Sequence, residues 1–247
     1  MFFSMIRDCE EIEVSIKLYN KDCYKFLPEL PDKCVDLAII DPPYEHEYHG
    51  GGQATRAKDY TVVKDNTDFM NDGFDYELVF SELCRICKIP NIICFCSNKQ
   101  IVKLMGWFEE RGLNPTLTTW KKPNACPLGN GKYISDLEFA IFARGKRVPW
   151  NSKAPSSIKY KCKVYPFVSG RNKLHPAEKP LKLIKEYVEL HSLKGCTVID
   201  CFMGSGTTAI ACKELGRDFI GIELEKKYFD IAKNRVINWK GNNNGQK

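Results

Sequence analysis

The sequence predicts an α/β protein with a mainly parallel sheet. Two observations support this fold class. Short apolar runs, typical of buried strands, alternate along the chain with longer segments that are typical of helices. In addition, residues 198–208 combine a strand, a glycine-rich turn and a helix start. Alternation of this kind places helices between neighbouring strands and therefore favours parallel pairing.

The predicted elements follow one another with few long gaps. Strands are expected at 16–20, 35–40, 92–96, 113–120, 137–143, 197–200 and 219–224. Helices are expected at 77–87, 100–111, 180–191, 207–215 and 226–239. The strands at 113–120 and 137–143 can pair with each other across the loop 123–131. The stretch 145–174 carries prolines and lysines and is expected to be irregular.

Composition limits the class of protein. The chain has 247 residues, which suits a single domain, 1–247, with one substantial core. No apolar run is long enough to span a membrane, and the N-terminal residues do not resemble a secretory signal. The twelve cysteines lie mostly in apolar runs, so we expect buried, reduced thiols in a cytoplasmic protein. Cys84 and Cys87 have zinc-knuckle spacing but no second pair nearby, so no metal is expected.

Basic residues are concentrated in one part of the chain. The net charge is +6, and the segment 144–173 contains nine Lys or Arg residues and no Asp or Glu. Four aromatic residues are interspersed among them, namely Trp150, Tyr160, Tyr165 and Phe167. Phosphate neutralisation combined with stacking groups is typical of nucleic-acid contact. The alternative is a solvated basic loop without a ligand.

The turn after the strand 197–200 is a candidate cofactor site. Glycines at 204 and 206 allow a ligand to approach the backbone, and the amides of the following helix start point towards it. Glu223 ends the next strand, nineteen residues after Gly204, where a carboxylate can bind both hydroxyls of a ribose. Two alternatives remain: residues 204–209 fit a dinucleotide fingerprint, and they also fit a tight turn before a packed helix.

A further acidic residue follows the first strand. If the strand 16–20 lies beside the strand that ends at Glu223, then Asp22, next to Cys23, can meet the amino group of an adenine ring. Asp22, Asp41, Asp200 and Glu223 would then all lie at the carboxyl ends of strands. The alternative for Asp22 is the N-cap of a helix that starts near Tyr24.

The sequence Asp41-Pro42-Pro43-Tyr44 is the candidate catalytic motif. The two prolines remove amide donors and fix an extended backbone, which leaves the Asp41 carboxylate and the Pro42 carbonyl as acceptors. Two acceptors can hold the N–H bonds of an exocyclic amine, and Tyr44 can stack on a base taken out of a duplex. The alternative is that the prolines only end a core strand and that Tyr44 is a packing residue without a catalytic role.

Taken together, these motifs resemble the N6-adenine and N4-cytosine DNA methyltransferases, in the group whose catalytic motif precedes the cofactor motif. The match covers more than half of the chain, and its order is more specific than any single motif. The resembling blocks are 18–22, 27–44, 120–124, 136–143, 175–180, 200–208, 219–223 and 228–235. Two positions depart from the family, which usually has Pro in place of Cys201 and Thr in place of Ala177.

The resemblance implies a doubly wound, mainly parallel sheet of seven strands with helices on both faces. It implies S-adenosyl-L-methionine as the cofactor and a flipped base of double-stranded DNA held by Asp41, Pro42, Pro43 and Tyr44. The residues expected to bind the cofactor are Asp22, Cys23, Lys179, Pro180, Asp200, Phe202, Gly204, Ser205, Gly206, Thr207, Thr208 and Glu223.

Two segments have looser expectations. The polar segment 45–75, which contains His46 and His49, is expected to be an active-site loop that closes over the base. The basic segment 144–174 lies where this group carries its target-recognition region. Because it is short, we expect a short DNA sequence or help from a second subunit, that is, a homodimer. A cognate restriction endonuclease is a further expected partner.

The target base is expected to be adenine, methylated at N6, because Asp at position 41 is more usual for that class than for cytosine N4. RNA is a less favoured substrate. Methylation at cytosine C5 is disfavoured because no proline is followed by cysteine. Two rivals from other classes remain. One is a nicotinamide-dependent oxidoreductase, which rests on residues 204–209 alone, and the other is a non-catalytic DNA-binding protein on a degenerate methyltransferase scaffold.

Overall fold

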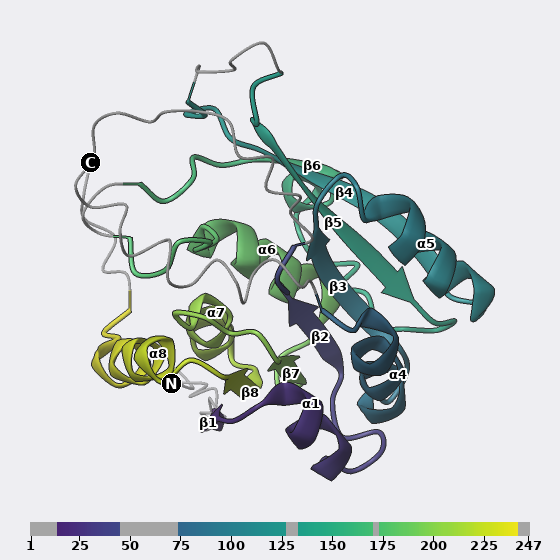
Figure 1. The fold of residues 1–247 in the computed structure, drawn as a ribbon, viewed down its shortest axis with the longest axis horizontal. Helices are drawn as coiled ribbons and strands as arrows, with labels where there is room; N and C mark the ends of the chain where they lie inside the picture. Colours follow the sequence, from purple (N-terminus) through teal and green to yellow (C-terminus); the bar gives the residue numbers. More distant parts are fainter. Residues whose placement is uncertain (1–13, 45–73, 127–132, 170–172, 242–247) are drawn as a thin grey trace, which may run out of the picture.

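The computed structural model describes residues 14–44, 74–126, 133–169 and 173–241, which form one sheet with helices on both faces (Figure 1). The strands lie in the order β1-β8-β7-β2-β3-β5-β4-β6. All pairings are parallel except those that β5 makes with β3 and β4. Because β5 is antiparallel to both neighbours, it alone runs against the other strands, and the sheet is mainly parallel as predicted.

The strands agree closely with the apolar runs of the sequence. Their bounds are β1 Ile16–Asn20, β2 Leu37–Ile40, β3 Asn91–Cys96, β4 Asn114–Lys121, β5 Leu137–Arg144, β6 Cys162–Val164, β7 Thr197–Asp200 and β8 Asp218–Glu223. The antiparallel pairing of β4 with β5 is confirmed, with Trp120 opposite Glu138. The neighbours β2 and β3 are buried over their whole length, which explains why they appear in the sequence as continuous apolar runs.

The helices cover the sheet on both sides. Their bounds are α1 Cys23–Phe26, α4 Tyr76–Ile86, α5 Ile101–Glu110, α6 Leu181–His191, α7 Thr207–Leu215 and α8 Lys226–Asn238. Alternate residues of β2 point to opposite faces. Ala38 and Ile40 pack with α4 and α5, whereas Leu37 and Ile39 pack with α6 and α7. The described part of the chain is therefore doubly wound. None of its helices has both the length and the apolar character needed to cross a membrane.

The structure corrects the predicted strand number. The sheet has eight strands rather than seven, because β6 forms within the stretch that was expected to be irregular. In β6 only the central residue, Lys163, is buried, and Cys162 and Val164 are exposed. A three-residue edge strand with a buried lysine has no apolar pattern, so periodicity could not predict it.

The topology brings the predicted acidic residues to one edge of the sheet. Asp200 and Glu223 end β7 and β8, while Asp41 follows β2 directly. Asp22 follows β1, whose last residue pairs with Glu223. Carboxyl ends of parallel strands are where ligands bind in such sheets. Most of the predicted active-site loop, residues 45–73, lies outside the described residues.

Candidate active site

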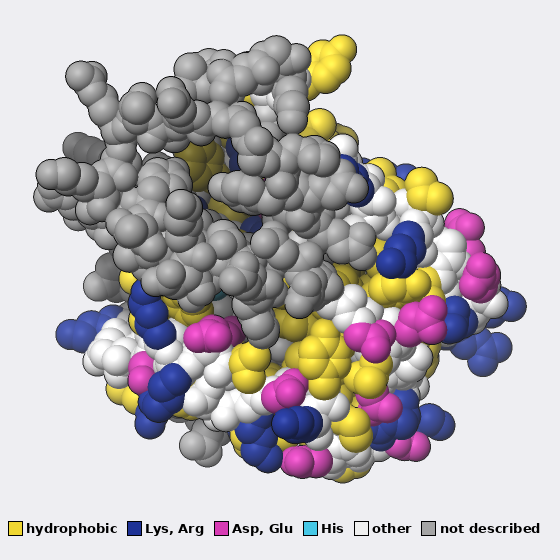
Figure 2. Space-filling model, in the orientation of Figure 1, with side chains coloured by type: hydrophobic (Ala, Val, Ile, Leu, Met, Phe, Trp, Pro, Cys, Tyr) yellow, Lys and Arg dark blue, Asp and Glu magenta, His cyan; other side chains and the backbone are white. Residues whose placement is uncertain are grey.

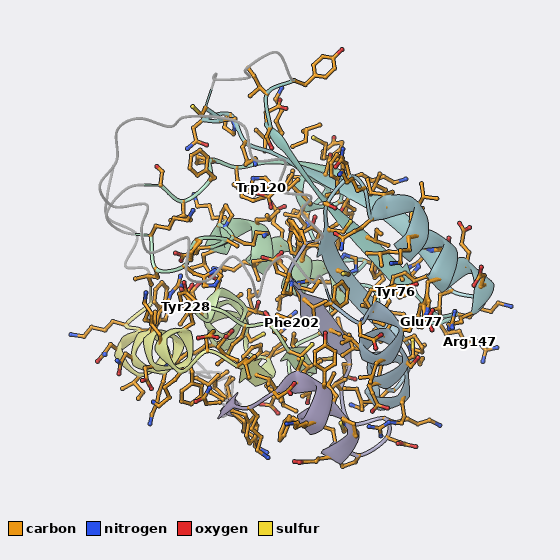
Figure 3. The ribbon with its side chains drawn as sticks, viewed as in Figure 1. Tyr76, Glu77, Trp120, Arg147, Phe202 and Tyr228 are labelled. Atoms are coloured by element: carbon orange, nitrogen blue, oxygen red, sulfur yellow. The ribbon has the colours of Figure 1, made fainter. Side chains whose placement is uncertain are left out.

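A cleft of about 240 Å³ opens at the carboxyl edge of β2, β7 and β8. Two of its lining residues are labelled in Figure 3, with Phe202 near the centre of the molecule and Tyr228 on α8. Of the predicted site residues, those that line the cleft are Asp41, Pro42, Pro43, Tyr44, Lys179, Asp200, Phe202, Gly204, Ser205, Thr207, Thr208 and Glu223. The catalytic motif and the glycine-rich turn therefore share one cavity, although about 160 residues separate them in the chain.

Four predicted residues do not line this cleft. Asp22 is the N-cap of α1, where Oδ1 accepts a hydrogen bond of 2.9 Å from the Tyr24 amide. Cys23 is buried in the same core cluster as Cys201. Pro180 is the buried residue that precedes α6. The capping alternative for Asp22 is therefore realised, although its position beside the Glu223 strand is also as expected.

Gly206 is the fourth predicted residue that does not line the cleft, and it lies on the side of the turn that packs against α8. Its φ is +79°, in the left-handed region, and a Cβ placed on it would lie 3.0 Å from the Cβ of Ala232 in α8. Gly204, in the cleft, also has a positive φ of +51°. Glycine is needed at 206 for two reasons, because other residues are strained at this φ and α8 packs against the turn. The turn is thus fixed where the amides at the start of α7 face the cleft.

The two acidic residues that end β7 and β8 hold this turn in place. Glu223 accepts hydrogen bonds of 2.9 Å from the amides of Gly204 and Glu225. Asp200 accepts a hydrogen bond of 2.7 Å from the Thr208 hydroxyl. Burial raises the pKa of Asp200 to about 7 and also raises the pKa of Glu223. Glu223 faces the cleft, where its carboxylate can bind a pair of vicinal hydroxyls.

The catalytic motif forms a compact polar cluster. Tyr44 donates a hydrogen bond of 2.9 Å to Asp41 Oδ1, and the ammonium of Lys179 lies 2.5 Å from Asp41 Oδ2. Lys179 Nζ also lies 4.9 Å from the centre of the Phe95 ring. Both carboxylate oxygens of Asp41 therefore have a partner at the floor of an aromatic and apolar cavity. This arrangement can hold an amine and stack a planar ring.

The charges in this cluster depend on one another. Burial raises the pKa of Asp41, and the neighbouring ammonium of Lys179 opposes that rise. Burial acts to lower the pKa of Lys179, but the carboxylates of Asp41 and Glu138 outweigh it, so the pKa of Lys179 is raised. Lys179 is consequently protonated at neutral pH and is held by two carboxylates.

Glu138 is a site residue that was not predicted from the sequence. It lies in β5, and its two carboxylate oxygens lie 3.3 Å from the ammonium groups of Lys122 and Lys179. An acidic residue near the start of a largely apolar strand was the available signal, because a half-buried charge in a core strand needs a cationic partner.

The segment before α6 supplies further residues that were not predicted as site residues. The His175 ring packs edge-on against Tyr228 with centroids 4.2 Å apart, and both residues line the cleft. Burial, with nearby Lys179, lowers the pKa of His175 to about 4, so its imidazole is neutral. Glu178 forms an ion pair of 3.0 Å with Arg235 of α8. These residues lie in blocks 175–180 and 228–235, where the resemblance had assigned a role only to Lys179 and Pro180.

The basic segment is only partly available to a ligand. Lys159 and Lys161 are exposed, as is Tyr160. Lys163 is 4% exposed and forms an ion pair of 2.9 Å with Glu186 of α6, so in this structure it is not available to neutralise a phosphate, unlike what was expected of the basic segment. It ended in the core because β6 joins the sheet edge and turns this side chain inward.

The described surface in Figure 2 carries interspersed basic and acidic side chains rather than one basic field. The described residues also contain no group of three or more His, Cys, Asp or Glu side chains that could hold a metal ion.

Comparisons with known proteins agree with this geometry. A family model of DNA methylases, the N6/N4 type, matches residues 35–234. The chain is 28% identical to the type II methyltransferase M.HinfI of Haemophilus influenzae, over 90% of this chain and 68% of that protein. It is 26% identical to the type II methyltransferase M1.MboII of Moraxella bovis, over 90% and 96% of the two chains. The crystal structure of an M1.HpyAVI–SAM complex superposes with a TM-score of 0.69, at 30% identity, over 91% and 100% of the two chains.

Proposed function

The chain belongs to the N6/N4 DNA methylase family and is an S-adenosylmethionine-dependent DNA amino-methyltransferase, and we propose that it methylates the N6 amine of adenine at specific sites. One observation carries the proposal. The Asp41 carboxylate and the Tyr44 ring lie in the same cleft as the glycine-rich turn and Glu223. An acceptor for an amine and a binding surface for a nucleoside cofactor are therefore adjacent.

The cleft suits S-adenosylmethionine on chemical grounds. Glu223 lines the cleft and can accept hydrogen bonds from the ribose hydroxyls, and Phe202 and Tyr228 offer apolar faces. Ser205 in the turn and Thr207 at the helix start also line it and can meet the polar end of the cofactor. When bound, the cofactor supplies a methyl group on a sulfonium centre, which is already electrophilic.

The protein's own task is then to orient and polarise the amine. The exocyclic nitrogen is a poor nucleophile because its lone pair is delocalised into the ring. An N–H bond donated to Asp41 helps to localise that lone pair towards the methyl group, and Tyr44 can stack on the flipped base. With the cofactor bound, the nitrogen–carbon bond would form as the sulfur–carbon bond breaks, and the methylated amine would lose one proton to solvent, directly or through the Asp41 carboxylate. No covalent bond to the protein is needed.

We further propose that the whole chain acts as one methyltransferase domain, in which the exposed part of 144–174 contributes to target recognition. Lys159, Lys161 and Tyr160 support this, because they combine charge with an exposed aromatic ring. A recognition segment this short suits a short DNA sequence or a homodimer. A restriction endonuclease that cleaves the same sequence would be the matching partner.

Nucleoside analysis tests the proposed reaction. Unmethylated bacteriophage DNA is incubated with the protein and S-adenosylmethionine, digested to nucleosides and examined by mass spectrometry. We expect N6-methyladenine from the wild-type protein and none from the Asp41→Ala variant, which should still bind the cofactor. N4-methylcytosine in place of N6-methyladenine would overturn the choice of base, and a product from Asp41→Ala would overturn the role of Asp41.

A further inference from the structure

Glu138 lies between two ammonium groups at the inner end of the site. Its Oε1 is 3.3 Å from Lys122 Nζ, and its Oε2 is 3.3 Å from Lys179 Nζ. Lys179 in turn lies 2.5 Å from Asp41 Oδ2. The four side chains form a row of alternating charge that runs from the residue after β4, through β5 and the segment before α6, to the residue after β2. All four are largely buried, with side-chain exposures of 8 to 24%.

This row creates a conflict at Asp41. One carboxylate oxygen accepts the Tyr44 hydroxyl and the other is occupied by the Lys179 ammonium. The target amine needs an acceptor on the same carboxylate, so the Lys179 ammonium competes with the substrate. An ammonium group has three N–H donors and can be shared between carboxylates. Its second carboxylate partner is Glu138.

We propose that Glu138 is a positioning residue that draws the Lys179 ammonium away from Asp41 and leaves Asp41 able to accept the target amine. The inference rests on methyl transfer to an exocyclic amine, but not on which base carries it. Lys122 holds Glu138 from the opposite side, so the Glu138 carboxylate cannot follow Lys179 towards the cleft.

Charge balance supports the same role. During transfer, positive charge moves from the sulfonium to the amine, next to Asp41. With Glu138 ionised, the charges of Lys122, Glu138, Lys179 and Asp41 sum to zero. Without it the group carries a net positive charge, which opposes a cationic cofactor and the developing cation. Fixed carboxylates act most strongly where water is excluded, as in this cluster.

The competing explanation is that Glu138 only anchors β5 to β4. A purely structural residue would lower stability without altering how the rate depends on pH. A positioning residue that acts through Lys179 has two distinctive consequences. The rate defect caused by removing Glu138 should become smaller when Lys179 is neutral. Removing Glu138 should change the rate little when Lys179 has already been replaced.

The test is a pH series on Glu138→Gln. Methyl transfer is measured in a single turnover with labelled S-adenosylmethionine and unmethylated bacteriophage DNA, from pH 7 to pH 9.5. At pH 7 we expect the rate to fall at least tenfold. Because Glu138 helps to raise the pKa of Lys179, its removal should let Lys179 deprotonate at lower pH. The defect should therefore shrink towards pH 9.5, to threefold or less.

Two further variants complete the test. In the Lys179→Met background, Glu138→Gln should change the rate of methyl transfer less than twofold. If the Lys179→Met variant is too slow to measure, the pH series on Glu138→Gln is the deciding test. Glu186→Gln removes a carboxylate from a comparable buried pair with Lys163, outside the cleft, and should leave the pH profile unchanged. An unchanged rate for Glu138→Gln, a tenfold loss that persists at every pH, or equal losses in both backgrounds would overturn the inference. The base that is methylated is identified separately from the wild-type product.

Discussion

Glu178 and Arg235 form an ion pair of 3.0 Å that joins the segment before α6 to helix α8. Arg235 Nη1 also donates to the carbonyl of Ser205 at 3.2 Å and to the Thr207 hydroxyl at 3.1 Å. The other carboxylate oxygen of Glu178 accepts the Leu174 amide at 2.9 Å. One guanidinium thus fixes the position of the Lys179 segment relative to the glycine-rich turn.

Arg235→Lys should weaken cofactor binding by about tenfold, because Glu178, Ser205 and Thr207 are all held by Nη1, and the shorter side chain of lysine places its ammonium short of that position. Isothermal titration with S-adenosylmethionine measures the effect. Lys226→Met, which breaks an exposed pair with Asp230 on the same helix, is the matched control and should bind as the wild type does. Equal affinities for Arg235→Lys and the wild type would show that the ion pair does not position the site.

Gly206→Ala should destabilise the fold and weaken cofactor binding. Its φ of +79° disfavours any side chain, and the new Cβ would lie 3.0 Å from Ala232. Gly112→Ala is a matched control, because Gly112 has a φ of +72° with no atom within 4 Å of an added Cβ. Strain alone should lower the free energy of unfolding by about 1–2 kcal/mol in the control. Urea denaturation should show a larger loss for Gly206→Ala, and equal losses would contradict the packing argument.

His191 should make the protein sensitive to acid. Burial lowers its pKa to about 3, and its ring packs 3.9 Å from that of Phe142. Between pH 6.5 and pH 3 the unfolded chain binds a proton that the folded chain does not, so stability falls as pH falls through this window. His191→Phe should reduce the loss between pH 7 and pH 4.5 by about 2 kcal/mol, measured by urea denaturation at both pH values. Parallel losses in the two proteins would contradict this.

The lysines of the basic segment should separate into two kinds. Neutralising exposed Lys159 and Lys161 should weaken DNA binding and reduce its dependence on salt, with a slope lower by about one for each phosphate that is no longer neutralised. Lys163→Met should leave that slope unchanged but cost about 3 kcal/mol of stability, because it leaves Glu186 as an uncompensated buried charge. Fluorescence anisotropy at several salt concentrations, with thermal melting, distinguishes the two kinds. A lower slope for Lys163→Met would contradict its burial.

The sequence by itself determined the seven longer strands, the five longer helices and the family. Buried parallel strands are continuous apolar runs, and the residues that end them, such as Asp41 and Glu223, follow directly in the chain. Patterns of this kind can be recognised in the sequence without knowledge of tertiary contacts. The same holds for the positive-φ turn, since only glycine suits Gly204 and Gly206.

Only the tertiary structure decided which charges meet. Glu138 and Lys179 are 41 residues apart in the chain, and nothing local pairs them. Pairing of β5 with β3 and the return of the chain before α6 bring them within 3.3 Å of each other. Burial of Lys163 was decided in the same way, because β6 pairs with the distant strand β4. Electrostatic partners depend on distance in space, whereas the apolar pattern depends on position along the chain, so only the second could be predicted from the sequence.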